Sequence, residues 1–216
     1  MKTWIKEHQY CYAVGYMLFY LAAFFISERV LEPKYIISCP MDDWIPFNEL
    51  YIIPYCLWYP LLIASWIFTM VTCKEDFQDL CMIMFGGMTL SIVLYWIFPN
   101  GLQLRPAEIP DNFCGRIVQL LHMVDTPGNV CPSIHVSSSA AIMAVALKSE
   151  VLKRRPALRW GTVILCILIC LSTVYLKQHS VVDVVCGFLV TAVLAVFTWY
   201  APWKTWMKGT WMEFFL

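Results

Sequence analysis

Six apolar runs alternate with shorter polar or proline-containing segments along the chain. They occupy residues 10–26, 51–73, 77–98, 134–147, 160–176 and 181–200. A helix needs roughly 17–25 residues to cross a hydrocarbon core about 30 Å thick. The pattern therefore predicts six transmembrane helices, of which the fourth is short. We expect the N-terminal end of that fourth helix to lie within the membrane rather than above it.

Composition agrees with a membrane location. Hydrophobic residues make up 60% of the 216 residues, and charged residues make up only 14%. Such a chain is typical of an integral membrane protein. We predict an all-α integral membrane protein whose six transmembrane helices form one bundle and one domain, 1–216, with short interfacial helices. The amphipathic, proline-interrupted segment 33–50 is expected to lie along the outer interface.

The charged residues and the N-terminus exclude two other classes of protein. Lys plus Arg and Asp plus Glu both number 15, and no basic run with interleaved aromatic residues occurs, so nucleic-acid binding is not expected. Lys2 and Lys6 before the first apolar run resemble a signal peptide, but "FFISERV" contains no small-x-small cleavage site. We therefore expect the first run to be a retained span.

The ten cysteines follow no metal-ligand or disulfide spacing. Seven lie in or at the ends of apolar runs, where cysteine behaves as a small hydrophobic residue. Only Cys39, Cys114 and Cys131 are expected in loops, so at most one disulfide could join members of that set.

The loop charges predict the orientation of the chain. With both termini in the cytoplasm, ten Lys and Arg residues lie on the inner side and five on the outer side, as the positive-inside rule requires. We expect a multi-pass protein of the cell membrane, with a bacterial plasma membrane as the working guess. In this topology the loop 99–133, the start of the fourth span and the turn before the sixth span meet on the outer face.

The stretch "VCPSIHVSSSA", residues 130–140, brings polar groups to that face. Ser133 follows Pro132 and can cap the fourth span, which leaves backbone N–H groups pointing towards the outer side. Free N–H groups and the helix dipole favour an anion. Ser133 as a structural cap alone is an equally good interpretation, but His135 at the start of the same span adds a titratable group.

The stretch "STVYLKQHSVVDVVCG", residues 172–187, contains a second polar pair. On a helix His179 and Asp183 share a face, and the carboxylate can hold one imidazole nitrogen and raise the basicity of the other. In a soluble protein this spacing would favour a surface ion pair. At membrane depth ionisable residues are costly and usually functional, so the pair is a candidate for nucleophilic or general-base chemistry.

Cations complete the candidate site. Arg105, just beyond the third span, could clamp a phosphate with its planar donor fork, although a lone interfacial arginine would more simply snorkel to headgroups. Lys177 precedes His179 by two residues. Together these groups describe phosphoryl transfer that needs no metal and no other cofactor.

These motifs resemble those of a known family. An R-P, a P-S-x-H and an S-x(6)-H-x(3)-D spread across six spans look like the type 2 phosphatidic acid phosphatase superfamily, over roughly residues 51–200. The resemblance implies that His179 is the nucleophile that forms a phosphohistidine, that Asp183 orients it and that His135 protonates the leaving group. Arg105 and Ser133 would bind the phosphoryl oxygens. It also implies a metal-independent site that faces away from the cytoplasm.

Three positions depart from the family pattern. Phe98 stands where the first motif has lysine, Thr173 where the third motif has arginine, and Ile134 where the second has glycine. We expect Lys177 to replace one of the missing cations, with Arg116 as a second candidate.

Four functions follow from these features. The first is a lipid phosphate phosphatase that hydrolyses a lipid phosphomonoester or diphosphate taken from the bilayer. The second is a phosphotransferase that moves the phosphoryl headgroup to an alcohol such as inositol, similar to inositol phosphorylceramide synthases. A lipid-binding protein without catalysis is the third. A proton-coupled transporter is the fourth, and it is disfavoured because the charges gather at one face and no inverted repeat occurs.

Overall fold

Long apolar helices dominate the computed structural model, which describes residues 8–216. Within this range five helices or continuous helix pairs are long and apolar enough to cross a membrane. They are η1 with α2 (Gln9–Gly15 and Tyr16–Val30), η2 with α4 (Glu49–Tyr51 and Ile52–Thr72), α5 (Lys74–Ile97), α9 (Pro156–Tyr175) and α10 (Val181–Tyr200). The protein is therefore an all-α membrane protein, as the hydropathy pattern predicts.

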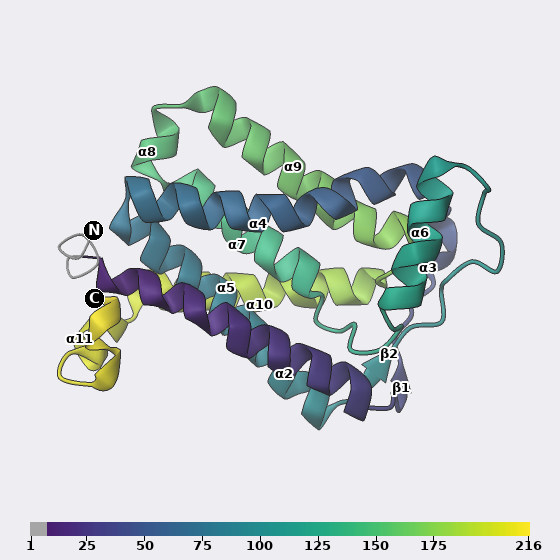
Figure 1. Cartoon of the computed structure of the whole chain (residues 1–216), viewed down its shortest axis with the longest axis horizontal. Helices are drawn as coiled ribbons and strands as arrows, with labels where there is room; N and C mark the ends of the chain where they lie inside the picture. Colours follow the sequence, from purple (N-terminus) through teal and green to yellow (C-terminus); the bar gives the residue numbers. More distant parts are fainter. Residues whose placement is uncertain (1–7) are drawn as a thin grey trace.

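The short helix α7, Ile134–Lys148, lies in the middle of the bundle and packs against α4, α5, α9 and α10 (Figure 1). Its buried residues include the run of small residues Ser137–Ala141, which lets neighbouring helices approach closely. The hydroxyl group of Ser138 finds two partners inside the bundle. Ser138 Oγ donates to the Ile134 carbonyl over 2.6 Å and accepts from Trp58 Nε1 over 2.8 Å. A helix of this length can therefore be buried without leaving this polar side chain unsatisfied.

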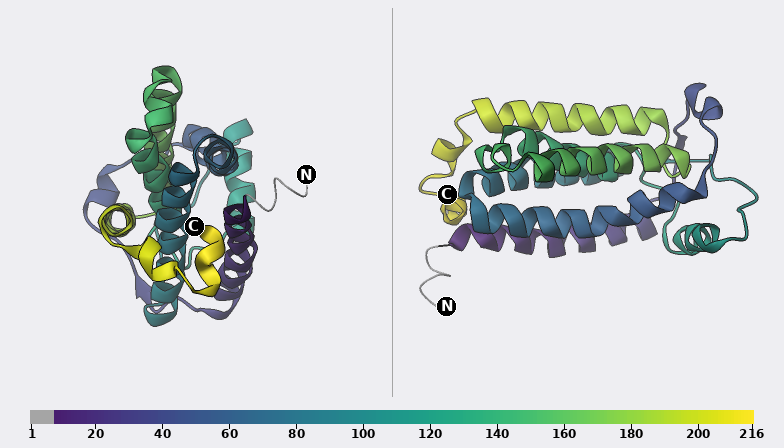
Figure 2. Two further views of the ribbon diagram at one scale, coloured as in Figure 1. Left: turned by 90° about the vertical axis from the view of Figure 1, so that its left-hand side faces the viewer. Right: turned by 90° about the horizontal axis from the view of Figure 1, so that it is seen from above.

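Short elements cover one end of the bundle. Two-residue strands β1 (Tyr35–Ile36) and β2 (Asn100–Gly101) pair in parallel, and the one-turn helix α3 (Met41–Trp44) follows β1. Figure 1 places β1, β2, α3 and α6 together at this end, and the view from above in Figure 2 shows the same arrangement. We refer to it as the covered end. The segment 33–50, which contains β1 and α3, therefore lies at the covered end, and its place along the outer interface of a membrane stays a prediction.

Three short helices lie at the opposite end of the bundle, together with the start of the first helix. The one-turn helix α8 (Glu150–Lys153), the short helix α11 (Trp203–Met207) and η3 (Trp211–Phe215) lie there with the start of η1 (Figures 1 and 2). We refer to it as the terminal end. Gln78 Nε2 on α5 donates to the Phe215 carbonyl over 2.6 Å, which fixes η3 to the bundle.

Helix α6, Phe113–Val124, corrects one expectation, because residues 99–133 and Cys114 with them were expected to form a loop. The Asn112 side chain accepts the Gly115 N–H over 2.9 Å and so caps the helix. Cys114 and Val118 then lie one turn apart on a face that packs against Tyr55 and Leu176. All ten cysteines are free thiols, so no disulfide forms among the three that were considered for one.

Helix boundaries differ from the apolar runs where polar residues extend a helix. α9 begins at Pro156 rather than residue 160, because proline favours the first helical turn and Arg159 can then lie within the helix. α2 continues through Glu28 and Arg29 to Val30 rather than ending at residue 26. The ends of α7 and α10 agree with the pattern to within one residue.

Candidate active site

The first turns of α7 and α10 meet at the covered end. Ser133 caps α7 by accepting the Val136 N–H over 3.3 Å, which confirms the predicted cap. Its own N–H donates to the Asp183 carbonyl over 3.2 Å and joins the two helix starts. A Cβ atom at Gly187 would lie 3.0 Å from the Ser133 carbonyl oxygen, so a glycine is needed for this approach.

His179 and Asp183 form a buried pair, but not on one helix face as expected. His179 lies in the turn before α10, Ser180 is the N-cap, and Asp183 is the third helical residue. Asp183 Oδ2 accepts the Ser180 N–H over 2.8 Å and lies 3.3 Å from His179 Nδ1. The capping box therefore sets the position of the carboxylate that holds the imidazole. Asp183 Oδ1 has no hydrogen-bond partner among residues 8–216.

Backbone hydrogen bonds to α9 fix the turn that carries His179. The backbone N–H groups of Gln178 and His179 both donate to the Thr173 carbonyl, over 3.0 and 3.1 Å. Thr173 itself is fully buried, and its hydroxyl group donates to the Cys170 carbonyl. The residue that stands where the family motif has arginine thus supports the turn through its backbone.

His135 lies beside this pair on α7. Its ring centroid is 5.9 Å from that of His179. The rings of Tyr55 and Trp58, both on α4, lie against it with centroids 4.5 and 4.2 Å away. His135 Nε2 is buried and has no hydrogen-bond partner in the described part of the chain. The site therefore contains two neighbouring histidines. His135 has an unpaired Nε2, and His179 has its Nδ1 next to the Asp183 carboxylate.

Arg105 reaches the site through Gln178, the residue before His179. Its Nη2 donates to Gln178 Oε1 over 3.0 Å, and its Nη1 donates to the Asp125 carbonyl over 3.0 Å. Arg105 Nε is buried and finds no acceptor within residues 8–216. His122 Nε2 lies 2.7 Å from Gln178 Nε2. Helix α6 therefore contributes His122 and Asp125 to the surroundings of the predicted phosphate-binding arginine.

Asp125 has a raised pKa, about 6, because burial and the nearby Glu28 oppose its charge more than Arg105 and His179 stabilise it. The unfolded chain ionises from about pH 4, so this carboxyl lowers the stability of the folded protein as the pH rises from 4 to 6. We expect wild type to lose about 1 kcal/mol more than Asp125→Asn between pH 4 and 7. Thermal unfolding at each pH measures this difference.

Asp111→Asn is the matched control, because the Asp111 side chain at the other end of α6 is 81% exposed. It should follow the wild-type pH profile. An Asp125→Asn profile parallel to wild type would contradict the assignment of a raised pKa to Asp125.

Asp42 is a buried carboxylate that sequence reasoning missed. It lies on α3, is 2% exposed, and accepts the Ser180 hydroxyl and the Val181 N–H over 2.7 and 2.8 Å. Lys177 has a left-handed backbone (φ 56°), and its ammonium group donates to the Asp42 carbonyl. α3 therefore fixes both sides of the turn that carries His179.

Asn100 fixes the segment that leads into α7, and no sequence pattern predicted this role. Its Oδ1 accepts the N–H groups of Val130 and Cys131 over 2.9 and 2.8 Å, and its Nδ2 donates to the Cys131 carbonyl. Tyr95 OH donates to the Pro132 carbonyl over 2.7 Å. Polar side chains from α5 and β2 thus fix the backbone that leads into Ser133. Their partners lie more than 25 residues away in the chain, so no local motif marks them.

The arrangement can be compared with known proteins. A family model described as the PAP2 superfamily matches residues 18–207, which is most of the chain. The chain belongs to the PAP2 superfamily. No curated protein and no solved structure gives a match. Membership shows an enzyme of the phosphatase or phosphoryl-transferase type that acts on lipid phosphates.

Two residues that bear on the missing motif cations have clear positions. Phe98, which stands where the first motif has lysine, stacks on Tyr35 with ring centroids 4.1 Å apart and so packs against β1. Arg116 pairs with Asp111 over 2.9 Å on the surface, and its side chain is 69% exposed. Within residues 8–216 no group of three or more His, Cys, Asp or Glu residues is arranged to hold a metal ion.

Proposed function

We propose that this PAP2 protein is a membrane lipid phosphate phosphatase. It hydrolyses a lipid phosphomonoester or diphosphate through a phosphohistidine at His179. The observation that carries the proposal is the buried His179–Asp183 pair beside the unpartnered Nε2 of His135. A nucleophile held by a carboxylate, with a second titratable group within reach of the leaving group, is the arrangement that covalent catalysis requires.

The reaction proceeds in two steps. With Nδ1 held by Asp183, His179 Nε2 attacks phosphorus, the bond from phosphorus to the lipid oxygen breaks, and His135 Nε2 gives that oxygen a proton. Water then attacks phosphorus, His135 Nε2 takes up a proton of that water, the bond from phosphorus to His179 Nε2 breaks, and inorganic phosphate leaves. The 5.9 Å between the two ring centroids is consistent with a phosphoryl group between them.

Arg105 and Ser133 bind the phosphoryl oxygens in this proposal. Arg105 is already fixed by Gln178 and the Asp125 carbonyl, and its free Nε adds a donor. Ser133 begins α7, whose first N–H groups favour an anion. Lys177 adds positive charge beside the His179 turn.

We further propose that α7 is the fourth of six spans in a single membrane domain, with the chain termini cytoplasmic and the site facing outwards. In support, the covered end with the site lies opposite the terminal end (Figure 1). The basic segment "KSEVLKRRPALRW" also lies at the terminal end, which the positive-inside rule assigns to the cytoplasm.

A phosphotransferase is the second candidate, and the polar groups around Arg105 favour it. The side chains of Gln178 and His122 lie 2.7 Å apart, and the Asp125 carboxylate lies 3.9 Å from Arg105 Nη2, so these groups can hydrogen-bond a hydroxyl acceptor next to the proposed phosphate site. In that case an alcohol such as inositol, or a second lipid, resolves the phosphohistidine in place of water.

Product analysis separates the two candidates. Purified protein in detergent is incubated with a panel of lipid phosphates and diphosphates in the presence of a chelator, with and without inositol. Inorganic phosphate as the product under both conditions supports the metal-independent phosphatase. A phosphorylated alcohol formed at the expense of free phosphate supports the transferase. Turnover that stops in chelator and returns on adding a divalent cation contradicts metal independence.

Lys177→Ala tests whether Lys177 replaces one of the missing cations. We expect turnover to fall by about tenfold or more, because a charge near the phosphoryl oxygens stabilises the transition state. Phosphate release measures the effect. Arg116→Ala is the control, since Arg116 is exposed and paired with Asp111. Lys177→Ala within a few-fold of wild type would contradict the replacement.

A further inference from the structure

A cavity opens at the terminal end, away from the candidate site. It has a volume of about 440 Å³ and lies between α4, α7, α8 and α9. Its lining is mainly aliphatic and includes Leu61 and Phe68 on α4, Val145 on α7, Leu152 on α8, and Leu158 on α9. In Figure 1 the ribbons of α4 and α9 diverge towards α8. We refer to this cavity as the α4–α9 groove.

The α4–α9 groove has the size and surface to hold a hydrocarbon chain. Its lining residues on α4 run from Leu61 to Thr69, which corresponds to a length of about 12 Å at 1.5 Å per residue. A Cβ atom at Gly161, on the α9 wall, would meet no atom within 4 Å, so the space beside it is open. Leu158 is 46% exposed, which leaves this wall open to the bilayer.

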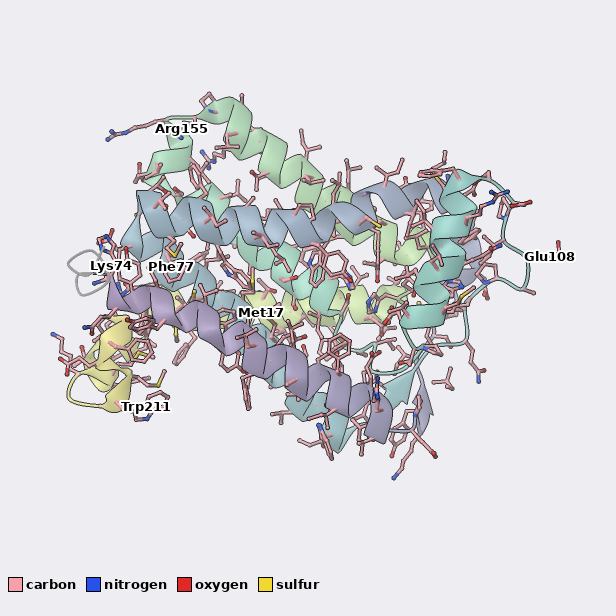
Figure 3. The ribbon with its side chains drawn as sticks, in the orientation of Figure 1. Met17, Lys74, Phe77, Glu108, Arg155 and Trp211 are labelled. Atoms are coloured by element: carbon pink, nitrogen blue, oxygen red, sulfur yellow. The ribbon has the colours of Figure 1, made fainter. Side chains whose placement is uncertain are left out.

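Positive charge lies at the end of the groove. The Arg155 guanidinium lies 5.8 Å from the ring centroid of Phe68, which lines the groove. Figure 3 shows the Arg155 side chain extending from the corner between α8 and α9. Arg154 is its neighbour in this exposed turn. Neither arginine forms a salt bridge within the described chain.

The two lysines on α7 and α8 near the groove are already neutralised. Lys148 pairs with Asp79 over 2.6 Å, and Lys153 pairs with Glu150. Arg159, in the first turn of α9, donates to the Leu147 carbonyl. Beside the groove, Arg154 and Arg155 are therefore the cations whose side chains form no salt bridge and no hydrogen bond among the described residues. An apolar groove that ends at two free arginines is complementary to a ligand with an apolar chain and a negatively charged head.

We infer that the α4–α9 groove binds an anionic phospholipid of the leaflet at the terminal end. One acyl chain lies against Leu158 and Gly161, and the phosphate lies at Arg154 and Arg155. Basic pockets between membrane helices bind such headgroups, and juxtamembrane arginines are attracted to anionic lipid. This site is separate from the histidine pair, and the inference does not depend on which reaction that pair performs.

A titration with soluble short-chain lipids tests the inference. The full-length protein in detergent is titrated with dioctanoyl phosphatidylglycerol or with dioctanoyl phosphatidylcholine. Thermal unfolding is followed by tryptophan fluorescence, because a ligand that binds the folded state raises the midpoint by an amount that grows with the logarithm of its concentration divided by its Kd. We expect phosphatidylglycerol to bind at least about tenfold more tightly than phosphatidylcholine.

Two sets of variants test the headgroup site and the acyl-chain site separately. Arg154→Gln with Arg155→Gln is expected to weaken phosphatidylglycerol binding about thirtyfold and to leave phosphatidylcholine unchanged. Gly161→Phe fills the groove and is expected to weaken both lipids by about tenfold or more. Gly161→Leu repeats this test with a smaller side chain.

Matched controls exclude a general charge or surface effect. Lys204→Gln with Lys208→Gln removes two charges at the same end, and Leu189→Phe enlarges an exposed apolar residue of α10. Both are expected to bind like wild type. Equal affinity for the two lipids, equal loss in the two charge-removal variants, or unchanged binding in Gly161→Phe and Gly161→Leu would each overturn the inference.

Discussion

Replacing His179 with alanine is expected to reduce lipid phosphate turnover by at least about 10⁴-fold and to leave the fold intact. The variant removes the atom that the proposed phosphohistidine needs. It also removes the imidazole from Asp183 Oδ2, but that oxygen keeps the Ser180 N–H. The capping box therefore persists, and the unfolding temperature should change little. Phosphate release and thermal unfolding on the same preparation measure both quantities.

Trapping the intermediate makes this test specific. Each protein is incubated with substrate labelled on the transferred phosphate, and the reaction is quenched in base. Wild type should then carry label that is stable in base and labile in acid, and His179→Ala should carry none. His122→Ala is the matched control, because His122 lies on α6 beside Gln178 and takes no part in forming the proposed phosphohistidine. It should retain labelling. Label that persists in His179→Ala would assign the nucleophile to another residue.

Replacing Asp42 with asparagine is expected to cost about 2 kcal/mol of stability and to lower kcat about 100-fold. Asp42 does not touch the proposed reacting atoms. Its two oxygens accept hydrogen bonds from Ser180 and Val181, and an amide offers one acceptor and a mismatched donor in their place. The turn that holds His179 would then shift, and small displacements of a nucleophile have large effects on rate. Steady-state kinetics should show the loss in kcat rather than in KM.

The pH dependence of stability separates this positioning role from general packing. Burial opposes the charge of Asp42, but the hydrogen bonds from Ser180, Val181 and Cys39 outweigh it and hold its pKa below the ordinary value. Its contribution is therefore complete above the unfolded pKa, near 3.9, and is lost as the pH falls through the folded pKa. The stability difference between wild type and Asp42→Asn should be full at pH 7 and shrink below about pH 4.

Asp43→Asn is the control for Asp42, because Asp43 is the exposed neighbour on the same one-turn helix. Its stability should lie within about 0.5 kcal/mol of wild type and its turnover within about twofold. An Asp42→Asn enzyme with wild-type kcat would show that α3 does not position the nucleophile.

Most of the fold could be predicted because apolar runs are long and directly visible in the sequence. The ends of α7 and α10 agree with the runs since both begin at a serine cap, and Ser133 and Ser180 are local signals. α6 was missed although Asn112 and the spacing of Cys114 and Val118 are typical of a capped amphipathic helix. Its apolar residues lie within only twelve positions and are interrupted by Arg116, Gln119 and His122, so they do not form a run of transmembrane length, and a hydropathy pattern alone does not detect the helix.

The candidate site could be predicted only where its contacts are local. His179 and Asp183 are four residues apart, so their pairing follows from spacing, although a capping box rather than a shared helix face produces it. Asp42 and Asn100 act on segments 138 and 31 residues away. Such contacts depend on how the helices pack, and no pattern within one segment encodes them.

The bridge between Asp42 and Ser180 has a consequence for biosynthesis. A membrane protein is made from its N-terminus, and 138 residues must be added after Asp42 before its partner exists. At about 5–20 residues per second this takes roughly 7–28 s. During that time α3 lacks the turn that it will fix, and His179, the proposed nucleophile, has not yet been made. The proposed reactive centre is therefore complete only after the helices from α2 to α9 have been made.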